Sequence, residues 1–106
     1  MKKVDLRQKR DFNGLAEFLR ETINVLEQYD LAHVPYIGIA EDGREIAGMC
    51  VPDKKLIIIN KNLYPHELKK TLMHEITHAV DFINDGHTSE RRTDKRTNYL
   101  YKQLYG

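Results

Sequence analysis

Residues 73–81 read Met-His-Glu-Ile-Thr-His-Ala-Val-Asp and contain the pattern His-Glu-x-x-His. Residues four positions apart lie on one face of a helix, so His74 and His78 can bind one metal ion. Glu75 lies one position round the helix, where its carboxylate can reach a water at that ion without ligating it. The stretch therefore predicts a helix that carries half of a metal site.

The helix that contains this stretch is predicted from Pro65 to about Ile83. Proline suits the first helical turn, where its missing N–H is no loss, and residues 84–86 (Asn-Asp-Gly) end the helix. Apolar residues recur at steps of three and four and predict a core-facing stripe that points away from the two histidines. The stripe consists of Leu68, Leu72, Ile76, Ala79, Val80 and Ile83.

An amphipathic helix is predicted earlier in the chain, from Asp11 or Asn13, both good N-caps, to about Tyr29. The residues expected to face the core are Leu15, Phe18, Leu19, Ile23 and Leu26. The residues expected outside are Glu17, Arg20, Glu21 and Glu27. Residues 1–10 are highly charged, and we expect them to be irregular or loosely attached.

Three strands are predicted between these helices. Val34–Ala40 and Glu45–Val51 flank residues 41–44, where Asp-Gly indicates a hairpin turn. Leu56–Asn60 is a short strand rich in β-branched residues. Pro35 lacks an N–H, which places the beginning of the first strand at a sheet edge or outside the sheet. We expect a small, mainly antiparallel sheet with helices on one face.

A last helix is predicted from Thr88 or Ser89, with Leu100 and Leu104 toward the core. The order of one helix, three strands and two helices predicts a single α+β domain over residues 1–106. A chain of this length can bury roughly 60–68% of its unfolded surface, which is enough for a modest core.

The composition gives no sign of a secreted, membrane or nucleic-acid-binding protein. Cys50 is the only cysteine, so no internal disulfide can form. No apolar run follows the basic start, and no stretch approaches the ~20 apolar residues of a membrane span. The net charge of +1 does not favour nucleic acid. We expect a cytoplasmic protein without membrane or nucleic-acid partners, and the sequence gives no oligomeric state.

A catalytic zinc site needs a third protein ligand if water is to take the fourth position. The downstream candidates are Asp81, Asp85, His87, Glu90 and Asp94. Asp81 shares the helix of the two histidines, whereas a tetrahedral ion wants its third ligand from another direction. We therefore expect Asp81 to orient a neighbour or to cap the cleft, and His87 stays open as a ligand.

An antiparallel hairpin of the last two helices would bring two carboxylates to the histidines. Glu90 would face the level of His78, and Asp94, about 6 Å further along the helix, the level of His74. One carboxylate could then bind metal while the other accepts the ring N–H of a histidine ligand and fixes its tautomer. Spacing alone leaves open which carboxylate has which role.

The pattern His74-Glu75-x-x-His78 followed by Glu90-x-x-x-Asp94 resembles the gluzincin clan of zinc metallopeptidases. The order of elements is also similar to that of the minimal soluble gluzincins. The resemblance implies a zincin-like domain with Zn²⁺ bound by His74, His78 and Glu90. It further implies Glu75 as general base and acid, and Asp94 as the hydrogen-bond partner of a ligand. The implied activity is that of a zinc metalloendopeptidase acting on a peptide or protein substrate.

Three further assignments accompany the resemblance. Tyr101 is the candidate for the clan's oxyanion helper, because it shares the helix face of Glu90 and Asp94. Asp81 would instead be the third ligand by similarity to the active-site stretch of some small intracellular and mitochondrial metallopeptidases. Extended substrates in such enzymes pair with a sheet edge, and Leu56–Asn60 is either that edge or an ordinary core strand.

A second hypothesis belongs to a different class of function. The chain could be a non-catalytic zinc-binding domain that interacts with protein or nucleic acid. Glu75 favours the enzyme, since a structural zinc site has no need of a general base. The short chain favours the interaction module, because little sequence remains to build substrate pockets.

Overall fold

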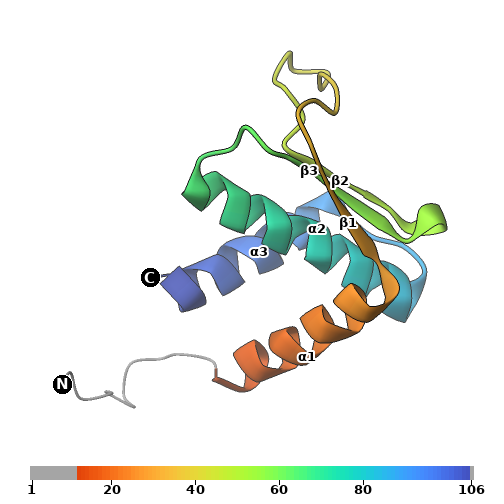
Figure 1. Ribbon diagram of the computed structural model, residues 1–106. Helices are drawn as coiled ribbons and strands as arrows, with labels where there is room; N and C mark the ends of the chain where they lie inside the picture. The colour runs from red at the N-terminus through yellow and green to blue at the C-terminus, as the bar shows by residue number, and fades with distance from the viewer. Residues whose placement is uncertain (1–11, 106) are drawn as a thin grey trace.

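The computed structural model describes residues 12–105, which form an α+β fold with three helices and a three-stranded mixed sheet (Figure 1). The expectation for residues 1–10 lies outside this range. None of the described helices has the length and apolarity needed to cross a bilayer. The elements are α1 (Phe12–Gln28), β1 (Asp30–Val34), β2 (Gly48–Val51), the 3₁₀ turn η1 (Pro52–Lys54), β3 (Leu56–Asn60), α2 (Pro65–Asp85) and α3 (Glu90–Tyr105).

The sheet has the strand order β1-β3-β2, with β1 parallel and β2 antiparallel to the central β3. The prediction of a mainly antiparallel sheet is therefore wrong. The error arises from the first strand, which lies at Asp30–Val34 and not at Val34–Ala40. Pro35 has no N–H to donate, so the parallel ladder from Asp30 opposite Leu56 ends at Val34 opposite Asn60.

The predicted turn at residues 41–44 is present, but the strands around it are reduced to one bridge between Ile39 and Glu45. Gly43 takes a positive φ of 84°, and the Arg44 N–H donates to Asp42 Oδ1 at 3.0 Å. Residues 35–47 project beyond the end of the sheet (Figure 1). The second strand consequently begins at Gly48, three residues later than predicted.

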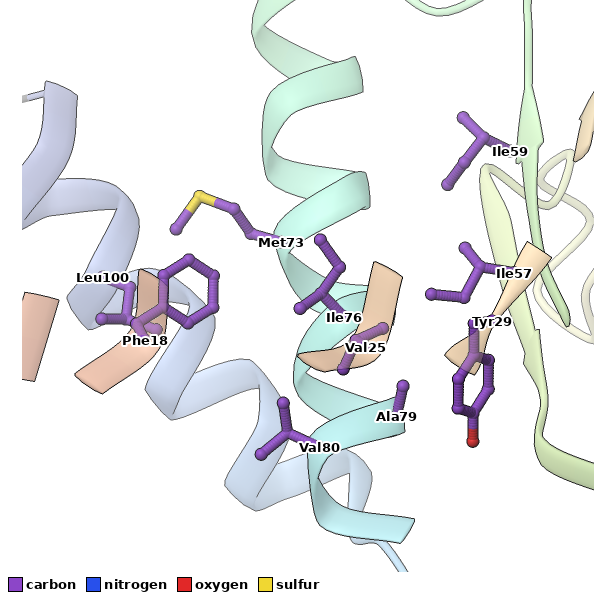
Figure 2. Close-up of a cluster of buried hydrophobic side chains, with 10 residues drawn as sticks. All are labelled: Phe18, Val25, Tyr29, Ile57, Ile59, Met73, Ile76, Ala79, Val80 and Leu100. Carbon is purple, nitrogen blue, oxygen red and sulfur yellow. The ribbon is translucent and has the colours of Figure 1, made fainter. Parts of the chain in front are cut away.

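Helix α2 is the centre of the fold and contacts α1, α3, β2 and β3. Its predicted stripe is confirmed: Ile76, Ala79 and Val80 are buried, and the other three members pack against the core from its margin. Figure 2 shows the α2 side chains between Ile57 and Ile59 of β3 on one side and α1 and α3 on the other. The helix ends at Gly86, whose φ of 74° lets its N–H reach the Phe82 carbonyl.

The predicted core face of α1 is confirmed for Leu15 and Phe18, but its other three residues lie on a second apolar face that is exposed. Phe18 and Val25 are buried, whereas Leu19, Ile23 and Leu26 are 56%, 59% and 53% exposed. Glu21, expected outside, turns inward, where its carboxylate accepts from Arg96 of α3 at 3.0 Å. The core therefore takes the Phe18–Val25 side of the helix, about a quarter of a turn from the centre of the predicted stripe.

Helix α3 packs through a narrow stripe of small side chains. Thr93, Thr97 and Leu100 are buried, while Leu104 is 38% exposed instead of reaching the core. Threonine side chains at the helix contact allow the two helix axes to approach closely. This approach matters for the site, since Glu90 and Asp94 must reach across to α2.

Gly48 allows an equally close approach on the opposite side of α2. It pairs with Ile59 and lies against the helix at Thr71 and Glu75. A Cβ atom at this position would lie 2.7 Å from Thr71 Cγ2 and 3.1 Å from Glu75 Cγ. Only glycine therefore fits between β2 and α2 without displacing one of them.

Gly48→Ala should lower the free energy of unfolding by about 1–3 kcal/mol, because the added methyl overpacks the contact with Thr71. Gly38→Ala is the matched control, since its Cβ would meet only Ile46 Cδ1 at an ordinary 3.5 Å. Urea denaturation of both variants measures the effect. Equal stabilities of the two variants would show that the β2–α2 contact tolerates a side chain.

Candidate metal centre

The turn between α2 and α3 brings three donor groups together. The Nε2 atoms of His74 and His78 lie 3.1 Å apart. The Glu90 carboxylate lies 3.2 Å from the first and 2.8 Å from the second. His74, His78 and Glu90 form the group in residues 12–105 whose arrangement could hold a metal ion.

These separations fit a tetrahedral ion. Zinc binds imidazole nitrogen and carboxylate oxygen at about 2.0–2.2 Å, so two of its tetrahedral ligands lie about 3.3–3.5 Å apart. The two Nε2 atoms, at 3.1 Å, are slightly closer than this, and each has a different Glu90 oxygen beside it, Oε2 at 3.2 Å from His74 and Oε1 at 2.8 Å from His78. Small rotations of the three side chains would suffice to accept the ion.

The outer ring nitrogens of the two histidines have oxygen partners of their own. His74 Nδ1 lies 3.3 Å from Asp94 Oδ1. His78 Nδ1 lies 2.8 Å from Thr88 Oγ1, whose hydroxyl donates to Asp81 Oδ2 at 3.1 Å. Because a carboxylate only accepts and the Thr88 proton is already engaged, we assign a proton to Nδ1 of both rings.

This assignment leaves a lone pair on each Nε2. Two imidazole lone pairs and a carboxylate then point at one volume, an arrangement that repels unless a cation lies between them. A proton on His78 is disfavoured, because burial lowers the pKa of this ring, although the negative charge of Glu90 opposes the shift. A divalent metal ion is the cation that the donor set suits.

The remaining candidate ligands lie elsewhere. Asp81 is buried but touches the site only through Thr88, and its other oxygen pairs with Arg92 at 3.3 Å. Asp85 pairs with the same Arg92, and His87 is exposed and outside the cluster. Tyr101 packs against the core and the Tyr105 ring and lines neither cavity at the site. The structure thus brings neither His87 nor Tyr101 to the metal-binding position.

Glu75 is buried beside the cluster, between β2 and α2. Burial raises the pKa of its carboxyl to about 8, and the negative charge of Glu90 adds to the shift. A cation held by the cluster would act in the opposite direction and favour the carboxylate. The protonation of Glu75 is therefore coupled to the charge at the cluster.

Two cavities meet at this carboxylate. One, of about 380 Å³, follows α2 toward its N-terminus, and the other, of about 450 Å³, extends over β2 toward α3. Both are lined by Gly48, His74 and Glu75. A groove therefore runs on both sides of the cluster, with Gly48 forming part of its wall.

Strand β3 cannot be the rim of this groove, because it is the central strand of the sheet. The edge strand beside the cluster is β2, whose residues Gly48, Met49 and Cys50 line the larger cavity. Burial raises the pKa of the Cys50 thiol to about 11, and Glu75 adds to it. Cys50 is thus a neutral thiol that packs against the core.

Sequence reasoning missed Thr88, Thr93 and Gly48. Thr88 looked like an N-cap, yet the Arg92 N–H donates to Ser89 Oγ at 3.5 Å, which leaves the Thr88 hydroxyl for His78. Thr93 is fully buried and lies 3.2 Å from Thr88 Oγ1. The sequence does not single out either threonine, because threonine is common at helix starts.

Comparison of the chain with protein-family models, with curated proteins and with solved structures gave no match in any of the three.

Thr88→Val should weaken zinc binding about 10–100-fold, because His78 loses the hydroxyl that accepts its Nδ1 proton and so keeps Nε2 directed at the cluster. Thr88→Ser keeps the hydroxyl and should restore affinity to within a few-fold of the wild type. Competition with a zinc chelator measures both. Equal affinity of the valine variant and the wild type would contradict the role of Thr88.

Glu75 should make the metal-free protein less stable as pH rises. Its folded pKa of about 8 exceeds the ordinary value of 4.5, so between these values the unfolded state releases a proton that the folded state keeps. Glu75→Gln should therefore gain stability over the wild type from pH 5 to pH 8, on the order of 3 kcal/mol at the upper end. Urea denaturation in a chelating buffer measures this difference, with Glu41→Gln as the exposed control. A difference that stays constant with pH would contradict the buried carboxyl.

Proposed function

We propose that the chain is a zinc-dependent metallopeptidase of minimal, zincin-like design. The observation that carries the proposal is the convergence of three lone-pair donors, His74 Nε2, His78 Nε2 and the Glu90 carboxylate, within 2.8–3.2 Å of one another. Two histidines and one carboxylate with an open fourth position are a donor set of catalytic zinc. The site faces solvent on the Glu90 side, where that side chain is 75% exposed.

The zinc ion would supply a lowered pKa for a coordinated water and a Lewis acid for the scissile carbonyl. The residues of the chain account for the rest. Asp94 and Thr88 hold the two imidazoles in one tautomer and one orientation. Glu75 takes a proton from the attacking water and passes it to the leaving amine.

The groove suggests how a peptide would bind. Strand β2 has a free edge beside Glu75, so an extended peptide could pair with it and lie across the cluster. Cavities on both sides of Gly48 leave room for residues on both sides of the cleaved bond. This arrangement favours an endopeptidase over an enzyme that trims chain ends.

Metal binding is the first test of this function. The purified protein should contain about one zinc per chain, and Glu90→Ala should weaken binding at least tenfold. Asp85→Ala is the matched control, because Asp85 pairs with Arg92 outside the cluster. Loss of zinc on Asp81→Ala or His87→Ala, with Glu90→Ala unaffected, would show that the third ligand is wrong.

Activity is the second test. Glu75→Gln should keep zinc but lose about 10²–10⁴-fold in the cleavage rate of a quenched fluorescent peptide library. Cleavage that survives this change would contradict the mechanism. A zinc-loaded wild-type protein that cleaves no peptide would instead favour the non-catalytic interaction module.

A further inference from the structure

The outer face of α1 carries large apolar side chains that nothing in residues 12–105 covers. Leu19, Ile23 and Leu26 are each more than half exposed. Leu31, 53% exposed, follows shortly after the helix ends. The buried face of the same helix, with Phe18 and Val25, packs on the core, so the outer face takes no part in the core of residues 12–105.

The exposed residues have the spacing of a coiled-coil seam. Ala16, Leu19, Ile23 and Leu26 alternate steps of three, four and three residues, which are the a and d positions of a heptad. The positions that flank the d residues hold Arg20 and Glu27, both exposed. Neither makes an ion pair within the described part of the chain.

The positions of Arg20 and Glu27 favour a second copy of the same helix as the partner of this face. In an antiparallel pair of identical helices with the twofold axis near Ile23 and Asn24, Ile23 and Leu26 of one chain face Leu26 and Ile23 of the other. Arg20 of each chain then faces Glu27 of the other, which gives two opposite-charge pairs. A shift of the helices by one heptad would pair Leu19 with Ile23 but would place Arg20 against Arg20. Reversing the charge of Glu27 distinguishes the two registers, because Glu27 faces Arg20 only in the first.

We propose that this face of α1 is a homodimer interface, in which α1 pairs antiparallel with α1 of a second copy of the chain. The helix is already formed by its contacts with the core, so association does not have to fold it. The contact of two short helices is small for a protein interface, so we expect weak, concentration-dependent association.

The dimer does not depend on the proposed activity. None of the α1 seam residues lines either cavity at Glu75. Pairing through α1 therefore leaves the groove open.

Sedimentation velocity of the full chain from 1 to 500 μM tests the proposal. The mass should rise from 12.5 kDa toward twice that value. Ile23→Asp should stay monomeric over the whole range, because a charge would be buried in the seam. Ile23 is exposed, so the variant should keep its thermal unfolding transition and its zinc content, which shows that it is folded.

Charge reversal distinguishes this pairing from any other dimer. Arg20→Glu and Glu27→Arg should each raise the dissociation constant about tenfold or more, since both cross-chain pairs become repulsive. An equimolar mixture of the two variants should form a heterodimer, because every cross-chain pair is then attractive again. Glu17→Arg, the same charge change on the same helix but away from the seam, should leave the dimer unchanged.

Two results would overturn the proposal. One is a wild-type chain that stays monomeric at every concentration of the sedimentation experiment. The other is a dimer that survives Ile23→Asp and is indifferent to the charge reversals, which would place the interface elsewhere.

Discussion

Strand β2 and helix α3 both approach α2 closely, and the rest of the structure is arranged around these two contacts. On one side Gly48 lets β2 lie against Thr71 and Glu75, where a Cβ atom would meet Thr71 Cγ2 at 2.7 Å. On the other side the small side chain of Thr93 lets α3 lie within hydrogen-bonding distance of His78. Both contacts hold polar groups of neighbouring elements against α2, and a metal centre requires such support from well-packed surroundings. The site is therefore a consequence of how the helices and the sheet pack.

Burial of the polar side of α2 lowers the folding stability of this small protein. Glu75, His78 and Asp81 are all buried, and the pKa of Glu75 rises while that of His78 falls, since burial opposes charge on both. Buried ionisable groups reduce stability unless a partner compensates them. A cation bound at the cluster would relieve the repulsion between donors and favour ionised Glu75. The residues of the candidate metal centre are therefore also residues whose burial lowers folding stability.

The sequence predicted what depends on local patterns and missed what depends on long-range packing. The bounds of β3 followed from its β-branched residues, the start of α2 from Pro65, and the approach of Glu90 and Asp94 to the histidines from an antiparallel hairpin of the last two helices. The parallel β1 could not be recognised, because its pairing with β3 is set across 26 positions, from Asp30 to Leu56, and by a missing N–H at Pro35. The core face of α1 was misassigned because the helix has two apolar faces, and periodicity cannot tell which one the domain uses. Thr88 and Gly48 matter through contacts that only the folded chain makes.

The central claim is that His74, His78 and Glu90 hold one metal ion. The most direct measurement is X-ray diffraction at the zinc absorption edge from crystals of the zinc-loaded protein. We expect one anomalous peak within about 2.0–2.2 Å of both Nε2 atoms and a Glu90 oxygen, with Glu75 unbound to it and a non-protein ligand in the fourth position. A peak that is coordinated by Asp81 or His87 instead of Glu90, or no peak at the two histidines, would contradict it.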